Sequence, residues 1–150
     1  MFSQLLAALG LLALSVTVHA FILTRLFERV SASPVLTDRR FWPSTWLMIR
    51  VACWAVLAHL VEISLWAVFY AWRHIMPDIE SSFYFSVVTY TTIGYGDLLP
   101  PLHWRLLAGV EGLTGILMCG WSTAFFFAIV SRMYGVAAKT PQEPGERGSS

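Results

Sequence analysis

A short segment, residues 91–97, holds the residues whose types and spacing are best suited to chemistry. It reads Thr-Thr-Ile-Gly-Tyr-Gly-Asp, so two glycines flank a tyrosine and an aspartate follows. Gly94 and Gly96 tolerate backbone angles that other residues avoid, which predicts a non-helical backbone here. The chemistry of the segment therefore belongs to its backbone groups and to the Tyr95 and Asp97 side chains, and what they do depends on the elements that position them.

Three long apolar stretches must position this segment, and they predict an all-α membrane protein. Of the 150 residues, 57% are hydrophobic and 13% are charged, against about 45–50% and about 25% in water-soluble domains. A helix needs about 20 apolar residues to cross the hydrocarbon core. Residues 1–26, 45–72 and 103–134 each meet this requirement, so we expect three transmembrane helices and contact with membrane lipid.

No motif in the sequence indicates an enzyme, a metal centre or nucleic-acid binding. It contains no Cys-x-x-Cys, His-x-x-x-His or Gly-rich phosphate loop. Cys53 and Cys119 both lie inside predicted spans, where we expect small buried apolar residues. The net charge of +1 suggests no nucleic-acid partner, and no soluble ligand domain is evident. We therefore expect no enzyme activity and no cofactor.

Positive charges predict the orientation of the chain. Arginines cluster in and beside the connection 27–44, and further basic residues follow the third span into the tail 135–150. Cytoplasmic segments are enriched in Lys and Arg, so we expect the N-terminus outside and the C-terminus in the cytoplasm. The first span must then be retained, although Val18-His19-Ala20 loosely resembles a signal-peptide cleavage site. The tail is expected to be short and disordered.

A further apolar stretch, residues 79–91, is too short to cross the membrane. Pro77 and Asp78 suit the start of a helix, where the macrodipole is positive. This helix should enter the membrane and stop partway, which leaves residues 92–97 at membrane depth. Irregular backbone is tolerated there only if it is buried in protein or lines a water-filled path. The arrangement therefore indicates a pore.

Residues 92–97, in this setting, resemble the signature of the potassium-channel superfamily. The resemblance covers an outer helix at 45–72, a pore helix at 79–91, the filter at 92–97 and an inner helix at 103–134. Within that superfamily the chain resembles small, prokaryote-like pore-loop channels, with one extra N-terminal transmembrane helix. It implies a homotetramer, because four loops must encircle each ion. The implied location is a bacterial inner (plasma) membrane.

The resemblance also assigns roles to single residues. The carbonyls of residues 92–95 would hold transient K⁺, with the Thr92 hydroxyl at the inner end and Asp97 at the outer mouth. The Tyr95 ring would brace the filter against aromatics such as Tyr84 or Phe85. The complete filter comprises Thr92, Ile93, Gly94, Tyr95, Gly96 and Asp97, and the supporting residues are Tyr84, Phe85, Thr91 and Glu111.

Polar residues inside the predicted spans leave alternatives open. Glu111 could face the conduction path or pack behind the pore helix against a hydroxyl such as that of Thr89 or Thr91, and we favour the second position. His59 and Glu62 share one helix face, so they could pair with each other or with the first helix. A pH-sensing role for His59 is a further alternative.

The inner helix carries residues for which the resemblance suggests a gate. Gly115 could be a hinge or a site of close helix packing. Ile116, Cys119 and Thr123 are expected to face a central cavity. The run 125–127, three phenylalanines, could narrow the cytoplasmic end or face lipid. No span carries Arg or Lys at every third position, so we expect no voltage-sensor helix.

The function that fits these features best is passive, potassium-selective conduction. One alternative is a weakly selective cation channel. Another is a non-conducting interaction subunit of a different channel or of a K⁺ uptake system. A single intact filter loop argues against an uptake transporter, which typically carries several degraded loops in one chain.

Overall fold

The protein is described by a computed structural model that covers residues 2–33 and 41–133. Within these residues every regular element is helical, so the predicted all-α class is confirmed. Three helices are long and apolar enough to span a membrane. The elements in chain order are α1 (Phe2–Ser31), α2 (Phe41–Trp72), α3 (Ile79–Tyr90), the short 3₁₀ turn η2 (Leu102–Trp104) and α4 (Arg105–Met133).

Two long helices extend beyond the predicted bounds. α1 continues to Ser31 rather than ending at residue 26, because no helix-breaking residue occurs before Pro34. α2 begins at Phe41 rather than at residue 45. Pro43 therefore lies in its first turn, where a missing backbone N–H breaks no helical hydrogen bond. The predicted tail 135–150 lies outside the described residues.

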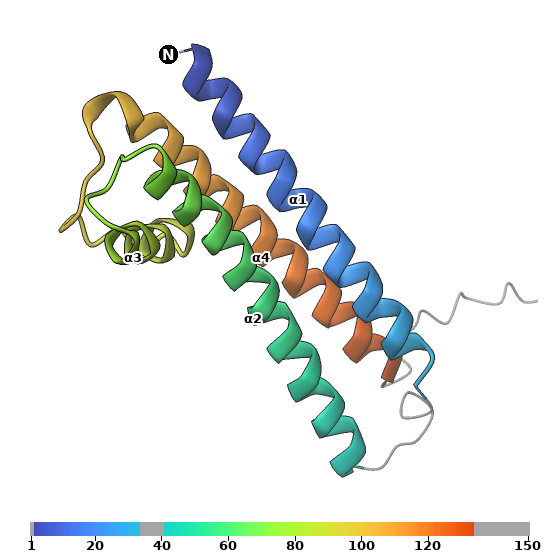
Figure 1. The fold of residues 1–150 in the computed structure, drawn as a ribbon. Coiled ribbons are helices and arrows are strands. Elements are labelled where there is room, and N and C mark those ends of the chain that lie inside the picture. Colours follow the sequence, from blue (N-terminus) through green and yellow to red (C-terminus); the bar gives the residue numbers. More distant parts are fainter. Residues whose placement is uncertain (1, 34–40, 134–150) are drawn as a thin grey trace, which may run out of the picture.

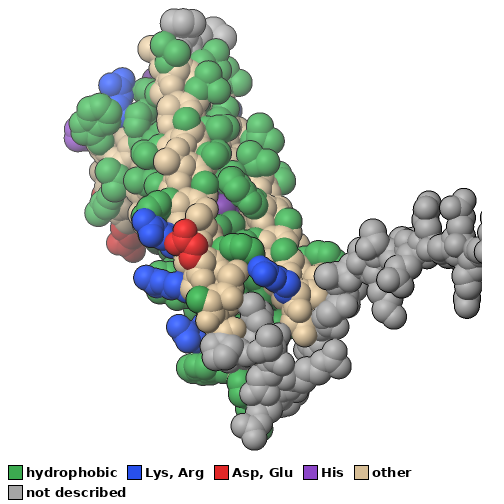
Figure 2. Space-filling model, turned by 90° about the vertical axis from the view of Figure 1, so that its right-hand side faces the viewer, with side chains coloured by type: hydrophobic (Ala, Val, Ile, Leu, Met, Phe, Trp, Pro, Cys, Tyr) green, Lys and Arg blue, Asp and Glu red, His purple; other side chains and the backbone are tan. Residues whose placement is uncertain are grey.

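The three long helices run side by side, and α3 lies at one end of them (Figure 1). α1 contacts both α2 and α4, while α3 packs against α2 and α4. The N-terminal end of α1 is at the same end as α3 and the loop that follows it (Figure 1). Lys and Arg side chains gather towards the opposite end, on a surface otherwise rich in hydrophobic side chains (Figure 2).

Apolar clusters join α1 to the rest of the fold at both ends. Near the N-terminal end of α1, Ala8 lies in a buried cluster with Trp66 and Phe85. At the other end, Leu26 and Val30 pack with α2 and α4. Many large hydrophobic side chains remain exposed on the outer faces of the long helices, as expected of surfaces that face lipid or another chain. The first helix is therefore an integral part of the packed structure.

Candidate functional site

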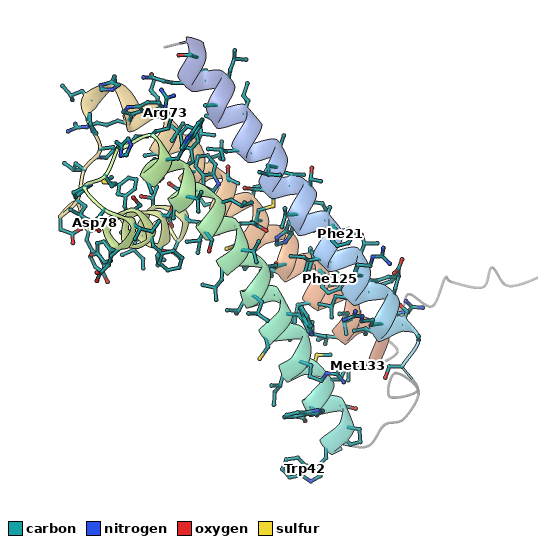
Figure 3. The ribbon with its side chains drawn as sticks, viewed as in Figure 1. Phe21, Trp42, Arg73, Asp78, Phe125 and Met133 are labelled. Atoms are coloured by element: carbon teal, nitrogen blue, oxygen red, sulfur yellow. The ribbon has the colours of Figure 1, made fainter. Side chains whose placement is uncertain are left out.

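The helix that leads into the predicted filter begins with a well-formed cap. The Asp78 carboxylate accepts a hydrogen bond from the Ser81 backbone N–H at 2.7 Å, which satisfies one of the free amides at a helix start. Asp78 lies at the N-terminal end of α3 (Figure 3). Glu80 in the first turn adds negative charge where the helix dipole is positive. The cap fixes where this short helix starts.

The end of α3 is held by the amides of the residues that follow. The N–H of Thr92 donates to the Thr89 carbonyl at 3.0 Å, while those of Ile93 and Gly94 donate to the Val88 carbonyl at 3.0 and 3.2 Å. Carbonyls in the last turn of a helix otherwise lack partners. The first filter amides therefore point back towards the helix.

The backbone of the filter segment alternates in handedness. Thr92, Gly94 and Gly96 have φ angles of 62°, 57° and 76°, whereas the intervening residues do not have positive φ. Glycine adopts this left-handed region readily, but for a β-branched residue such as Thr92 it is unusual. A left-handed residue at every second position rotates successive peptide planes. The segment is thus neither a helix nor an ordinary strand.

At the outer end of the segment, Asp97 is tied to α3. The Tyr84 hydroxyl donates to an Asp97 carboxylate oxygen at 2.7 Å, and the Leu98 N–H donates to the other at 3.0 Å. The hydrogen bond from Tyr84 lowers the pKa of Asp97, and the same bond raises the pKa of Tyr84. These bonds hold the carboxylate in its ionised form at the solvent-exposed end of the loop.

The predicted brace around Tyr95 is not formed within one chain. The Tyr95 side chain is 70% exposed, and Tyr84 binds Asp97 instead. Phe85 is buried and packs edge-on against the Tyr70 ring at 5.2 Å between centroids. Beside the loop lies a recess of about 310 Å³ between α3, residues 94–100 and α4. Its lining includes both Tyr84 and Phe85.

Glu111 is buried between α2, α3 and α4, which favours the predicted position behind α3 over one that faces a conduction path. Its side chain is fully buried. One carboxylate oxygen accepts from the Ser86 hydroxyl at 2.5 Å, and the other accepts from the Tyr70 hydroxyl at 2.7 Å. The expected partners Thr89 and Thr91 are not used, since the rotation of α3 turns Ser86 towards α4. The Thr91 hydroxyl instead donates to the Val87 carbonyl at 2.6 Å.

A second polar cluster, which we call the interhelical cluster, consists of His19, His59, Glu62, Tyr90 and Ser122. Glu62 pairs with the first helix, one of the two predicted alternatives: its carboxylate is 2.6 Å from His19 Nδ1. His59 Nδ1 lies 3.1 Å from the Tyr90 hydroxyl. No sequence pattern indicated His19, Tyr90 or Ser122, because polar residues at single positions do not reveal which helices they face.

Gly115 packs against the end of α3. A Cβ atom at this position would overlap the Tyr90 backbone carbonyl oxygen, so the predicted close packing is present, and α4 runs without a break from Arg105 to Met133. Ile116, Cys119 and Thr123 are exposed on this helix.

The structure revises the expectations for the two cysteines and for the phenylalanine run at 125–127. Cys53 and Cys119 are both exposed in the single chain, so the expectation that protein buries them is wrong for one chain. Phe125 packs against Phe27 of α1, with ring centroids 6.2 Å apart, on the side of α4 that faces α1 (Figure 3). Phe127, by contrast, is 69% exposed. The three phenylalanines therefore do not share one role.

Comparison with known proteins decides the family. Residues 56–132, slightly more than half of the chain, match the family model described as "Ion channel". The chain belongs to the ion-channel family. The matched region of this channel chain begins within α2 and contains α3, the loop and almost all of α4. α1 lies outside it.

Curated relatives of the channel chain include potassium-channel proteins, which supports the predicted resemblance to the potassium-channel superfamily. It is 33% identical over 89 residues to the human "Voltage-gated potassium channel regulatory subunit KCNG2", covering 59% of this chain and 18% of that protein. It is 27% identical over 96 residues to the "Potassium voltage-gated channel protein Shal" of Drosophila melanogaster, covering 61% and 17%. The channel chain thus spans less than a fifth of the length of these relatives. No solved structure gives a significant match.

Proposed function

We propose that four copies of this chain form a passive potassium-selective channel whose filter is residues 92–97. One observation carries this proposal: the left-handed backbone at Thr92, Gly94 and Gly96, directly after a helix too short to span the membrane. In an extended strand, successive carbonyls point to opposite sides. A left-handed residue at every second position allows them to point to the same side, as a path lined by carbonyl oxygens requires.

The hydrogen bonds around the segment support the same assignment. The backbone N–H groups of Ile93 and Gly94 donate hydrogen bonds to the Val88 carbonyl. Among the residues that the structure describes, no backbone N–H donates to a carbonyl of residues 92–96. Those oxygens are therefore available to replace the hydration shell of K⁺. The C-terminal, negative end of the α3 dipole also lies at the inner end of the filter, where it favours a cation.

The exposed Tyr95 supports an assembly of several copies. A large aromatic ring that is 70% exposed lies on the same loop as an apolar recess lined by Tyr84 and Phe85. In a ring of four chains, Tyr95 of one copy could enter the recess of the next, which would supply the brace that one chain lacks. Closed cyclic symmetry is also the simplest way for one loop per chain to surround an ion.

The proposed orientation places the filter mouth and the N-terminus outside and the C-terminus in the cytoplasm. In support, most of the Lys and Arg side chains visible in Figure 2 lie in its lower half, away from the N-terminal end of α1, as the positive-inside rule requires of a cytoplasmic end. With the resemblance to small prokaryote-like channels, this favours the bacterial inner membrane. The only small-molecule partner in this proposal is the permeant K⁺.

Reconstitution of the purified chain into lipid bilayers tests the proposal. With K⁺ on one side and Na⁺ on the other, we expect a reversal potential close to that of a K⁺ electrode. Equal permeability to the two ions would instead assign the chain to weakly selective cation channels. Native mass measurement in membrane-like detergent should give a tetramer, and a stable dimer would contradict the pore.

Gly94→Ala tests the filter assignment directly. An L-residue in the left-handed region is disfavoured by roughly 1–2 kcal/mol per position, and the change is repeated in each of four chains. No atom lies within 4 Å of the added Cβ, so the effect comes from the backbone. Selective current should be lost. Gly10→Ala in α1, where the added Cβ also meets nothing within 4 Å, should conduct normally.

The human relative gives a reason to keep a second candidate, because its printed name describes a regulatory subunit. By analogy, this chain could act only in mixed assemblies. A purified chain that forms stable tetramers but carries no current, and that changes the current of a co-expressed potassium channel, would favour this candidate over the first.

A further inference from the structure

The interhelical cluster has no part in the filter, yet it joins all four helices at membrane depth. His19 comes from α1, His59 and Glu62 from α2, Tyr90 from the last position of α3, and Ser122 from α4. His19 and Glu62 are fully buried, and Tyr90 is 1% exposed. Ionisable groups in such surroundings are expensive to bury and need a functional explanation.

Five hydrogen bonds connect these side chains. His19 Nδ1 lies 2.6 Å from Glu62 Oε1, and the Tyr90 hydroxyl bonds the other Glu62 oxygen. His59 Nδ1 lies 3.1 Å from the Tyr90 hydroxyl oxygen. The Ser122 hydroxyl lies 3.1 Å from His19 Nε2 and 3.2 Å from His59 Nε2. Together the bonds form a closed ring.

Counting hydrogens shows that this ring needs one proton more than its neutral hydroxyls and imidazoles supply. Tyr90, Ser122 and each neutral imidazole carry one hydrogen apiece, four in all, for five bonds. The fifth can sit on His19 or His59 beside an ionised Glu62, or on Glu62 itself. In each arrangement every bond has its hydrogen and the ring has no net charge.

Loss of that proton has two consequences in this environment. One of the five contacts is left with two acceptors facing each other, and the ring carries a net negative charge among apolar side chains. Both are unfavourable in a low dielectric. Besides the ring members, the ionisable groups near Tyr90 and Glu62 are Cys119 and Glu111, both on α4. Neither supplies a compensating positive charge.

Tyr90 connects the ring to the start of the proposed filter. It is the last residue of α3, two positions before Thr92. Its hydroxyl is held by Glu62, and its backbone carbonyl packs against Gly115. The start of the filter is therefore anchored through one side chain of the ring, whose contact with His59 is one of those that loss of the extra proton can leave without a hydrogen.

We propose that the interhelical cluster holds one exchangeable proton and that its loss loosens Tyr90 and reduces K⁺ conduction. This inference rests on the proposed channel function. It gives α1 a role, because His19 completes the ring. His19, Glu62 and Tyr90 are then positioning residues that act on the filter without touching the ion. Conduction is therefore highest with the proton bound and falls as pH rises.

A metal ion is the competing occupant of this cluster. One ligand atom each from His19, His59 and Glu62 lie within 4.8 Å of one another. However, each of these side chains already has its hydrogen-bond partners within the ring. A divalent cation with a single carboxylate would also leave a net positive charge among apolar side chains. A proton fits the ring without either difficulty.

Glu62→Gln is the decisive variant, because a glutamine amide copies the protonated carboxyl group and cannot lose its hydrogen. Its N–H can donate to His19 while its carbonyl accepts from Tyr90, so all five bonds survive. In proteoliposomes, raising the pH from about 6 to about 9 should reduce wild-type K⁺ flux about fivefold. This is the change in an equilibrium constant that corresponds to the net free energy of one hydrogen bond. The variant should keep the low-pH flux throughout.

Two further variants complete the flux experiment. Tyr90→Phe removes the link between ring and filter, so flux should be low and independent of pH. His103→Gln removes an exposed histidine outside the ring and should leave the wild-type profile unchanged. A flat wild-type profile, or the same pH response in Glu62→Gln as in wild type, would overturn the inference. So would a response that needs added Zn²⁺ and disappears with a chelator, since that would assign the cluster to a metal.

Magnetic resonance of ¹⁵N-labelled histidine separates this inference from the channel proposal. In the wild-type protein, the His19 and His59 signals should change together over the same pH range, and in Glu62→Gln they should stay constant. If the wild-type chain carried no K⁺ at any pH, the channel proposal would fail while this titration still supported the exchangeable proton. Histidine signals that titrate identically in both proteins would overturn it.

Discussion

Thr92 and Asp97 are the first and last residues of the proposed filter, and each is held by a different physical means. Thr92 adopts a left-handed backbone with φ of 62°, a conformation that costs a non-glycine residue about 1–3 kcal/mol and persists only when its surroundings enforce it. The hydrogen bond from the Thr92 N–H to the Thr89 carbonyl of α3 is part of that enforcement. Asp97 is fixed by its side chain, through the Tyr84 hydroxyl.

Replacing Tyr84 with Phe should change how the channel responds to acid. The hydrogen bond from Tyr84 lowers the pKa of Asp97, so the ionised carboxylate is favoured. Its contribution to conductance is therefore lost only as pH falls below the ordinary aspartate pKa of about 4. Without the hydroxyl, Asp97 should protonate at higher pH, close to that ordinary value. The measurement is single-channel conductance against pH on the filter side. An unchanged acid profile in Tyr84→Phe would mean that Asp97 does not influence conduction.

At the scale of helices, the sequence predicts elements better than it predicts their contacts. The cap of α3 could be predicted because Pro77, Asp78 and Glu80 act locally, within one turn. The partners of Glu111 could not, since Ser86 and Tyr70 lie on other helices and the rotation of each helix depends on packing along its whole length. The same holds for His19, which in the sequence resembled only part of a cleavage site.

Gly115→Ala should weaken the contact between α4 and α3. The new Cβ would overlap the Tyr90 carbonyl oxygen, and a backbone atom cannot move aside as a flexible side chain can. Overpacking of this kind costs about 1–3 kcal/mol, which should lower the midpoint of thermal unfolding in detergent. Gly109→Ala is the matched control, because nothing lies within 4 Å of its added Cβ. Equal stability of the two variants would contradict this packing.

For the whole molecule, hydropathy and charge were sufficient to predict three transmembrane spans. What the exposed faces of these helices contact depends on how the chains assemble. Ile116, Thr123 and Phe127 are exposed on α4, and Tyr95 is exposed on the filter loop. Such surfaces face either lipid or another chain. Four copies around an axis would turn one face of α4 towards a water-filled cavity and leave outer faces to lipid, so exposed residues should divide into two environments.

The two cysteines offer a test of that division. Both are exposed in the single chain, but Cys119 lies on α4 near Thr123, whereas Cys53 lies on α2. A thiol reacts through its thiolate, which needs water. In the reconstituted channel, a charged thiol reagent should therefore modify Cys119 roughly tenfold faster than Cys53.

Single-cysteine proteins, Cys53→Ser and Cys119→Ser, allow the two rates to be measured separately by mass spectrometry. Reaction at Cys119 should also reduce K⁺ current, because the added group would occupy the cavity, and reaction at Cys53 should leave the current unchanged. If both cysteines reacted slowly and at the same rate, Cys119 would face lipid. The face of α4 that carries Cys119 would then not line the pore.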